Sequence, residues 1–221
     1  MKLLALDTST EACSVAVMAL DTVQERFELG QKHSSRILVM VEELLAETEL
    51  TLTQLDALAF GRGPGSFTGL RIGTGVIQGL AFGADLPVVP ISSLAALAVA
   101  QEAPRVLTAF DARMSEIYWA AYSCHAQGQI ELIGSECVVT PEQVPVPKEG
   151  DWLGTGSGWD RYHEVLMRRL GERVKGWRRQ CYPRAQYVAR LGAVGFDSGK
   201  AVSAEQALPL YMRDAVVVRE S

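Results

Sequence analysis

We predict an α/β protein of two lobes, each built on a mixed β-sheet, from three observations. Short apolar strands alternate with helical stretches along the chain. The stretch ALDTSTEACSVAV near the N-terminus is matched, at a constant offset of 104 residues, by TAFDARMSEIYWAA, and this match aligns Asp7 with Asp111. Between the two copies, QEAPR at 101–105 has the composition of a boundary. The two lobes are therefore expected at 1–102 and 103–221.

The first lobe begins with three strands that are expected to pair antiparallel, at 2–6, 13–20 and 24–30. A helix is expected from Ser34 or Ser35, since either is a suitable N-cap, to about Thr48. Apolar residues at a helical spacing line one face of it. Val39 and Met40 widen this stripe beyond what one core contact requires.

A buried strand at 56–61 leads into a glycine-rich loop, GRGPGSFTGLRIG, at 61–73. The next helix is expected at 66–82, because Gly83 and then Pro87 provide stop signals beyond it. Two further elements close the lobe, a strand at 87–92 and a short helix at 93–101.

The second lobe repeats the opening hairpin and adds a third strand at 129–134. A proline-rich stretch, PEQVPVP, follows at 141–147. The remaining elements are a strand at 151–154 and helices near 159–170 and 184–195.

The composition excludes several classes of protein. Apolar residues make up 48% and charged residues 21% of the chain, as in an ordinary soluble globular protein. No apolar run reaches the roughly 18 residues that cross a bilayer, and Asp7 interrupts the apolar N-terminus. We therefore expect a cytoplasmic protein without a membrane partner. The four cysteines form no C-x-x-C pair and the three histidines are isolated, so we expect reduced thiols and no metal site.

The loop at 61–73 has the strand, glycine-rich turn and helix that can hold a phosphate, but it completes no phosphate-binding motif. A Walker-type loop needs a lysine that is absent here, and the dinucleotide fingerprint fails because Thr68 replaces its third glycine. Gly75, Gly79 and Gly83 are instead spaced by four. We expect them to form a flat ridge on which another backbone packs closely.

Six segments together resemble the bacterial TsaB (YeaZ) family. They are LLALDTSTEACSVAV, KHSSRIL, GRGPGSFTGLRIG, PVVPISSLAALA, FDARMSEIYWA and LPLYMRD. The match runs from end to end and is densest over the first 120 residues. The resemblance implies the two-lobed fold of actin, Hsp70 and sugar kinases, in agreement with the repeated pattern of strand, aspartate and hairpin.

The resemblance also implies a role in making threonylcarbamoyladenosine, the modified adenosine beside the anticodon of tRNAs that read codons beginning with A. In this family's pathway a metal-holding TsaD-type subunit transfers the threonylcarbamoyl group, and a TsaE-type ATPase joins the complex. The resemblance implies a non-catalytic scaffold that meets tRNA indirectly, through that complex. We therefore expect no enzyme activity, no cofactor and no metal of its own, and a homodimer when the TsaD-type subunit is absent.

The alternative is an ATP-dependent phosphotransferase of the same fold. Its candidate nucleotide-binding residues are Asp7, Thr8, Ser9 and Asp111. The first three would form a phosphate-facing hairpin, and Asp111 would hold magnesium or act as the catalytic carboxylate. The competing interpretation is turn capping, in which these side chains bond to nearby N–H groups, and the hairpin pattern favours capping.

The net charge of −5 is unevenly distributed. Between Arg161 and Arg190, nine basic residues stand against two acidic ones, with aromatic residues interleaved. Such a surface can bind phosphate backbones or stack on bases, and the plainer interpretation is a solvated helix face with its aromatics turned inward. The residues that would contact tRNA or an acidic partner are Arg168, Arg169, Arg178 and Arg179.

A partner interface is expected on the two long helices of the first lobe, because they carry more apolar surface than one core can use. The residues expected at it are Ile37, Val39, Met40, Leu44, Leu70, Gly75, Val76, Gly79 and Gly83. The glycine spacing lets a partner helix approach closely, so that many weak contacts accumulate.

Overall fold

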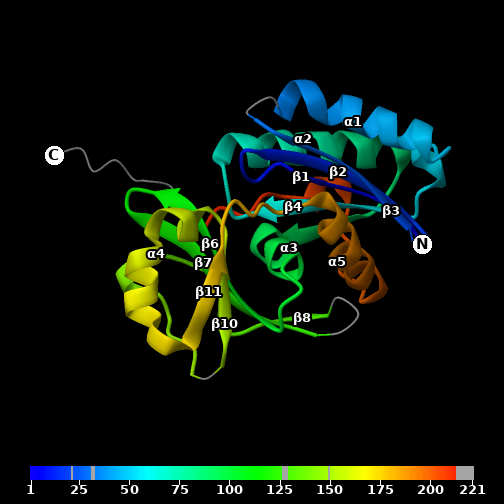
Figure 1. The fold of residues 1–221 in the computed structure, drawn as a ribbon. Helices are drawn as coiled ribbons and strands as arrows, with labels where there is room; N and C mark the ends of the chain where they lie inside the picture. The colour runs from blue at the N-terminus through cyan, green and yellow to red at the C-terminus, as the bar shows by residue number, and fades with distance from the viewer. Residues whose placement is uncertain (21, 31–32, 126–128, 149, 213–221) are drawn as a thin grey trace.

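The chain folds into two lobes, one following the other along the sequence (Figure 1). The computed structural model describes residues 1–20, 22–30, 33–125, 129–148 and 150–212. In Figure 1 the N-terminal lobe runs from blue through cyan to green and the C-terminal lobe from green to yellow, and the orange helix α5 (Ala185–Asp197) returns to the N-terminal lobe.

The N-terminal lobe contains a five-stranded mixed sheet. Its strands are β1 (Lys2–Asp7), β2 (Ala12–Ala19), β3 (Thr22–Leu29), β4 (Ala57–Gly63) and β5 (Val88–Ser92). They lie in the order β3-β2-β1-β4-β5. Strand β1 is antiparallel to β2 and parallel to β4, so Leu4 pairs with Val17 on one side and Leu58 on the other. The three strands predicted at the start of the chain therefore form one half of this sheet.

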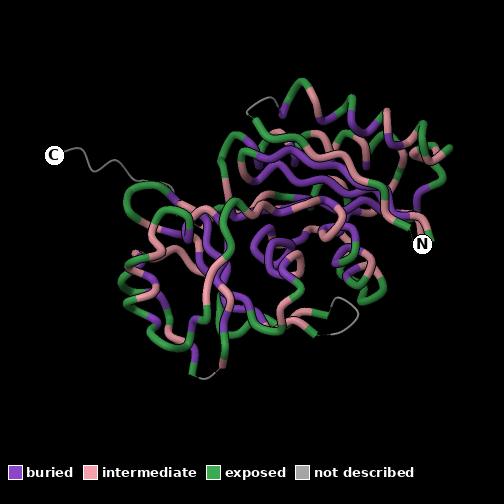
Figure 2. Tube along the Cα trace, in the orientation of Figure 1, coloured by how far each residue is buried: buried purple, intermediate pink, exposed green. Residues whose placement is uncertain are grey.

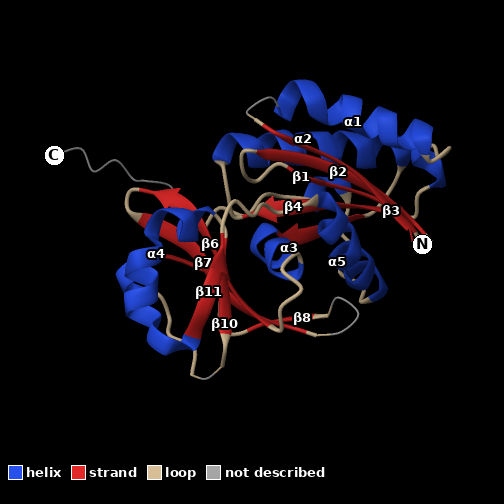
Figure 3. Cartoon of the chain, viewed as in Figure 1, coloured by secondary structure: helices blue, strands red, loops and turns tan. Residues whose placement is uncertain are grey.

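Helices cover both faces of this sheet (Figure 3). They are α1 (His33–Glu47) and α2 (Phe67–Ala84) on one face, and α3 (Ser93–Val99) and α5 on the other. Side chains alternate along a strand, so β1 supplies both layers. Leu4 and Leu6 pack in the layer beneath α1 and α2, whereas Leu3 and Ala5 pack beneath α3 and α5. Figure 2 shows the buried strands between the two helical layers.

The C-terminal lobe contains a six-stranded mixed sheet in the order β11-β10-β6-β7-β8, with β9 paired to β7. Its strands are β6 (Arg105–Arg113), β7 (Glu116–Cys124), β8 (Ile130–Leu132), β9 (Cys137–Val139), β10 (Trp152–Thr155) and β11 (Val174–Arg178). Helix α4 (Ser157–Leu170) covers one face. Its Trp159 is fully buried and donates a hydrogen bond from Nε1 to the carbonyl oxygen of Leu107 at 2.9 Å, which fixes α4 on β6.

The two sheets share one plan. Strands β6 and β7 form an antiparallel hairpin like that of β1 and β2, and in each lobe a parallel strand pairs with the other edge of the first strand. Asp7 ends β1 and Asp111 lies near the end of β6, at the offset seen in the sequence. The predicted architecture, two mixed-sheet lobes built on the same plan, is confirmed.

Some elements differ from the prediction. Helix α5 lies in the second half of the sequence but packs on β1, β2 and β4. Beyond it, Val202 pairs with Val88 at the edge of β5. The proposed division at 102–103 therefore does not apply to α5 or to the residues after it. The sequence predicts neither β9 nor β11, because CVV and VKGWR are too short or too polar to show a clear alternation.

The described part of the chain ends along α2. The side chain of Gln78 donates a hydrogen bond to the carbonyl oxygen of Ala207, and Leu210 N donates one to that of Arg62. The LPLYMRD segment is described only as far as Met212, so its last two residues lie outside the described residues. Within the described part, no helix has both the length and the apolar character needed to cross a bilayer.

Candidate functional site

Asp7 lies inside the N-terminal lobe, where β1 turns into β2. It is 1% exposed, and its carboxylate accepts hydrogen bonds from Ser9 N at 2.9 Å, Ser9 Oγ at 2.7 Å and Ser93 Oγ at 2.9 Å. Burial raises the pKa of Asp7, and the hydrogen bonds from Ser9 and Ser93 offset part of that rise. Thr8 is as deeply buried as Asp7 and Ser9. These contacts are those of a turn cap, and they leave no face of the hairpin open to a phosphate.

The glycine-rich loop packs directly on this turn. Four glycines spaced by four residues face it from β4, the loop and α2: Gly61, Gly65, Gly69 and Gly73. A Cβ atom on Gly69 would overlap the carbonyl oxygen of Thr8, and one on Gly65 would overlap that of Ser9. Ser66 N donates a hydrogen bond to Ser9 O at 2.7 Å, and Thr8 Oγ1 donates one to Gly69 O at 2.8 Å. The Asp7 turn therefore packs against this loop at the position that a bound phosphate takes in a phosphate-binding loop.

Asp111, the matching residue of the C-terminal lobe, is an ion-paired carboxylate. Its side chain is 13% exposed and accepts a hydrogen bond from the Arg161 guanidinium at 2.8 Å. Arg113 N donates a second bond to it at 3.0 Å. The nearby loop GTGSG at 154–158 packs on β6, since a Cβ atom on Gly156 would overlap the carbonyl oxygen of Ala109. Neither aspartate presents a free carboxylate to a substrate.

Four residues expected at the partner interface lie in the core instead: Ile37, Met40, Leu44 and Leu70. The first three are fully buried beneath α1 against the sheet, and Leu70 is 2% exposed beside Gly63. That part of the prediction is wrong. Met40 belongs to the core face with which α1 rests on β2 and β3, whereas Val39 is exposed.

The glycine ridge of α2 faces outward. A Cβ atom added to Gly75, Gly79 or Gly83 would have no neighbouring atom within 4 Å. Beside the ridge, Val76 is half-buried and Phe82 is 81% exposed. Helix α1 lies next to α2 (Figure 1) and adds two exposed apolar residues, Leu38 and Val39. We call these seven residues the outer helix face.

The basic segment at 161–190 does not form one helix face. It runs from α4 through the edge strand β11 to the start of α5. Its aromatic side chains contact the protein: the Trp177 ring stacks on His163 at 4.9 Å, and Tyr182 packs on Phe27. The sequence pattern of cations and aromatics is thus partly explained by internal contacts, among them Arg179 over Trp177 at 4.9 Å.

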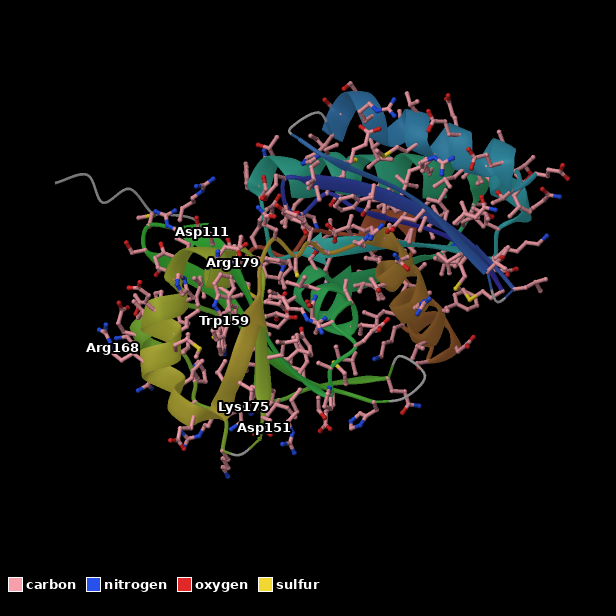
Figure 4. The ribbon with its side chains drawn as sticks, in the orientation of Figure 1. Asp111, Asp151, Trp159, Arg168, Lys175 and Arg179 are labelled. Atoms are coloured by element: carbon pink, nitrogen blue, oxygen red, sulfur yellow. The ribbon has the colours of Figure 1, made fainter. Side chains whose placement is uncertain are left out.

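The four candidate arginines divide into two pairs. Arg169 Nε donates a hydrogen bond to Val144 O at 3.3 Å, and an Arg178 nitrogen donates one to Gln101 O at 2.7 Å. These two arginines hold neighbouring loops. Arg168 and Arg179 are exposed, and Figure 4 shows Arg168 on the outer side of α4. The structure does not gather all four on one surface element.

The described residues offer little chemistry of their own. No three His, Cys, Asp or Glu side chains among them lie together as a metal site would require. The four cysteines are free, and burial raises the pKa of Cys13 and of Cys124 to about 11, so both are protonated thiols at neutral pH.

The sequence did not reveal that Gly61, Gly65, Gly69 and Gly73 all contact the Asp7 turn. Their spacing of four was visible, but the turn they contact lies far away in sequence.

Comparisons with known proteins point to tRNA threonylcarbamoyladenosine synthesis. The family model for TsaD, tRNA N6-adenosine threonylcarbamoyltransferase, matches residues 27–158. The tRNA threonylcarbamoyladenosine biosynthesis protein TsaB of Escherichia coli (strain K12) is 41% identical over 98% of this chain and 96% of its own length. The protein of the same name from Haemophilus influenzae is 43% identical over 98% and 95%. The structure of YeaZ from Pseudomonas aeruginosa superposes with a TM-score of 0.88 at 46% identity, covering 95% of this chain and 99% of that one.

Proposed function

Because this chain belongs to the TsaB (YeaZ) family of tRNA threonylcarbamoyladenosine biosynthesis proteins, we propose that it is a non-catalytic scaffold subunit in that pathway. It pairs with a TsaD-type transferase subunit, works with a TsaE-type ATPase, holds no cofactor of its own and meets tRNA through the assembled complex. The observation that carries this proposal is the outer helix face, an exposed apolar surface with an open glycine ridge.

The fold of the isolated chain does not require glycine on this ridge. Three glycines lower the stability of α2 by about 3 kcal/mol relative to alanine. Core packing cannot be the reason, since a Cβ atom at Gly75, Gly79 or Gly83 would point into open space. A partner backbone packed on the ridge would need the absence of those Cβ atoms. The exposed ring of Phe82 adds apolar area that a partner would bury, at about 25 cal/mol per Å².

The proposal places a homodimer of the isolated chain on the same face. A surface that is flat along one helix is self-complementary under a two-fold axis, which brings the ridge of one copy onto the ridge of the other. In this proposal the second copy and the TsaD-type subunit compete for one surface. The homodimer is then the form of the protein without its partner.

The alternative function, an ATP-dependent phosphotransferase of the same fold, is disfavoured by the geometry of its candidate site. Asp7, Thr8 and Ser9 are each 1% exposed beneath the glycine loop. Asp111 is neutralised by Arg161. A phosphoryl-transfer site requires a magnesium-binding carboxylate and donors that reach the phosphates, and these four residues are committed to internal contacts.

The outer helix face is tested by Gly79→Leu. The new side chain keeps the helix and raises its intrinsic stability, but it displaces any backbone packed on the ridge. We expect at least a hundredfold loss of affinity for the TsaD-type subunit, measured by co-purification and calorimetry, with the thermal unfolding midpoint unchanged or higher. Glu164→Leu is the matched control, because it adds the same side chain at an exposed position of α4. If Gly79→Leu binds the TsaD-type subunit as the parent protein does, the outer helix face is not the interface.

The absence of catalysis has its own test. The isolated chain, stripped of metal and free of the TsaD-type subunit, is incubated with threonylcarbamoyl-adenylate and tRNA. We expect no modified adenosine, because the described residues hold no metal site and no activated nucleophile. Turnover by the isolated chain would overturn the scaffold role, and it would do so whether or not the outer helix face binds a partner.

A further inference from the structure

A pocket of about 700 Å³ lies between the two lobes, away from the Asp7 turn. One wall comes from β5 and α5 of the N-terminal lobe, and the other comes from His125 and residues 129–131 of the C-terminal lobe. Its volume falls within the range of small-molecule sites, about 300 to 1,000 Å³. None of the residues proposed above for partner or tRNA contact lines it.

The N-terminal wall of this inter-lobe pocket is largely aliphatic. Val89, Ile91 and Leu191 are buried in it, and Val194 stands at its rim with 44% of its surface exposed. Such a wall stabilises an apolar ligand body by removing it from water.

One edge of the pocket carries cationic side chains. Arg62 and Lys200 line it, together with His125, whose ring lies 3.9 Å from Glu131. Within the described part of the chain, the buried Nε atom of Arg62 has no hydrogen-bond partner. A buried donor without a partner costs about 1 to 3 kcal/mol, and more when the group is charged. Because this Nε atom is closed off from solvent, a ligand in the pocket would meet the terminal nitrogens of the Arg62 guanidinium, and a guanidinium binds a carboxylate through parallel hydrogen bonds.

The neighbouring polar groups favour a singly charged ligand. Glu136 accepts hydrogen bonds from the hydroxyls of Ser92, which lines the pocket, and of Tyr122. The two hydroxyls are thereby occupied, and the cationic donors that line the pocket are Arg62 and Lys200. The charge of Glu136 raises the pKa of the buried Tyr122 and that of Arg62 lowers it, so both charges lie near the Tyr122 hydroxyl. A nearby carboxylate repels a phosphate dianion more than a carboxylate monoanion.

A peptide added to the edge of β5 is not a suitable occupant. Val88 already exchanges two backbone hydrogen bonds with Val202. The next outward-facing position along the edge is Pro90, which has no N–H to donate. The edge is therefore closed to strand addition, whereas the pocket beside it remains open to a small molecule.

We propose that the inter-lobe pocket is a binding site for a small aliphatic carboxylate, with its carboxylate on Arg62 and its apolar body against Val89, Ile91 and Leu191. This site is independent of the outer helix face and of the scaffold role.

The experiment is a titration of the full-length protein, followed by amide chemical shifts, with 4-methylpentanoate as the probe. The neutral isostere 4-methylpentanamide and inorganic phosphate are titrated in parallel. We expect saturable shifts at Ser92, Ala95 and Gly195, and at least tenfold tighter binding of the carboxylate than of the amide. Arg62→Gln should remove that preference, whereas Lys175→Gln, which changes a cation on β11, should leave it intact.

Val194→Trp provides a second variant that alters no charge. It fills the rim of the pocket at an exposed position and should abolish the shifts even if Arg62→Gln fails to fold. Equal binding of amide and carboxylate, tighter binding of phosphate, or full binding by Val194→Trp would each overturn the proposal. The absence of saturable binding by the parent protein would overturn it as well.

Discussion

Asp7 and the glycines around it form a close-packed unit whose chemistry is structural. Three donors surround the carboxylate, and a Cβ atom at Gly61 would overlap its Oδ2 atom. The sequence suffices to reject the phosphate motifs at this loop, because the required lysine and third glycine are missing. It does not reveal what the glycines contact, since the Asp7 turn reaches them only through the pairing of β1 with β4.

Two kinds of glycine in α2 should respond to alanine with opposite signs. Gly69→Ala places a Cβ atom on the carbonyl oxygen of Thr8, where neither backbone can yield, so we expect a loss of about 1 to 3 kcal/mol of unfolding free energy. Gly75→Ala and Gly79→Ala meet open space and improve helix propensity, so we expect a gain of up to about 1 kcal/mol. Urea unfolding, at protein concentrations too low for dimerisation, measures both changes in unfolding free energy. A loss at Gly75 equal to that at Gly69 would mean that the ridge is packed within the lobe.

Asp7 should also make stability depend on pH. Its pKa is raised in the folded state above the ordinary value of about 3.9, so the folded protein keeps this proton to higher pH than the unfolded chain. The stabilisation from this group is therefore complete below about pH 4 and is lost as the pH rises through the folded pKa. Asp7→Asn removes the titration while its amide still bonds to Ser9 and Ser93.

Urea unfolding of the parent protein and of Asp7→Asn, measured from about pH 4 to pH 7, checks this sign. We expect the variant to gain stability relative to the parent protein as the pH rises. If the parent protein instead gains stability relative to Asp7→Asn as the pH rises, the carboxylate is stabilised in its ionised form. That result would show that the hydrogen bonds outweigh burial at Asp7.

At the scale of elements, the sequence predicts well which helices and strands form and in what order. It predicts poorly which face of a helix is buried. The helix expected from about Ser66 begins there, since Ser66 caps α2 and its hydroxyl accepts a hydrogen bond from Gly69 N at 3.3 Å. The assignment of Met40 to a partner surface is wrong, because a periodicity of 3.6 marks a stripe without saying how wide the supporting sheet is. The sequence predicted only in part which face of α2 is buried. Its two glycine rows look alike in sequence, and only the fold separates the buried row from the exposed one.

Only two of the four arginines that the sequence suggested are suitable for a test of tRNA binding by the basic segment. Replacing Arg169 or Arg178 would also break hydrogen bonds to Val144 and Gln101, so loss of binding would be ambiguous. The double variant Arg168→Gln, Arg179→Gln changes two exposed cations instead. We expect it to weaken tRNA binding by the assembled complex and to lower the slope of affinity against salt concentration by about one for each lost phosphate contact.

Lys148→Gln, an exposed change outside the basic segment, is the matched control for that measurement. The control should leave affinity and salt slope as they are in the parent complex. If the double variant behaves like the control, the excess positive charge of this segment serves the protein's own cation–π contacts and loops, and tRNA is bound elsewhere in the complex.

At the scale of the whole molecule, the chain crosses between the lobes more often than its repeated pattern suggests. After completing the second sheet it returns as α5, whose Gln186 N donates a hydrogen bond to Glu25 of β3 at 3.0 Å. Gly192 sits so close to Ala59 of β4 that a Cβ atom there would lie 2.7 Å from the Ala59 methyl. No sequence signal indicated this return, because an apolar helix stripe does not specify which sheet it covers.

The return of α5 predicts that the N-terminal lobe cannot fold from its own residues. A fragment of residues 1–102 keeps α1 and α2 on one face of the sheet, but on the other face only the short α3 would cover Leu3, Ala59 and Val89. We expect this fragment to show no cooperative urea transition by circular dichroism, because uncovered aliphatic residues on a sheet favour aggregation over a native state. Fusing residues 185–212 to the fragment through a flexible glycine–serine linker should restore a cooperative transition, since it returns α5 and the pairing of Val202 with Val88. Fusing the same segment with Gly192→Leu is the control, because the larger side chain cannot approach Ala59. Cooperative unfolding of 1–102 alone would show instead that α5 is an accessory to a self-sufficient lobe.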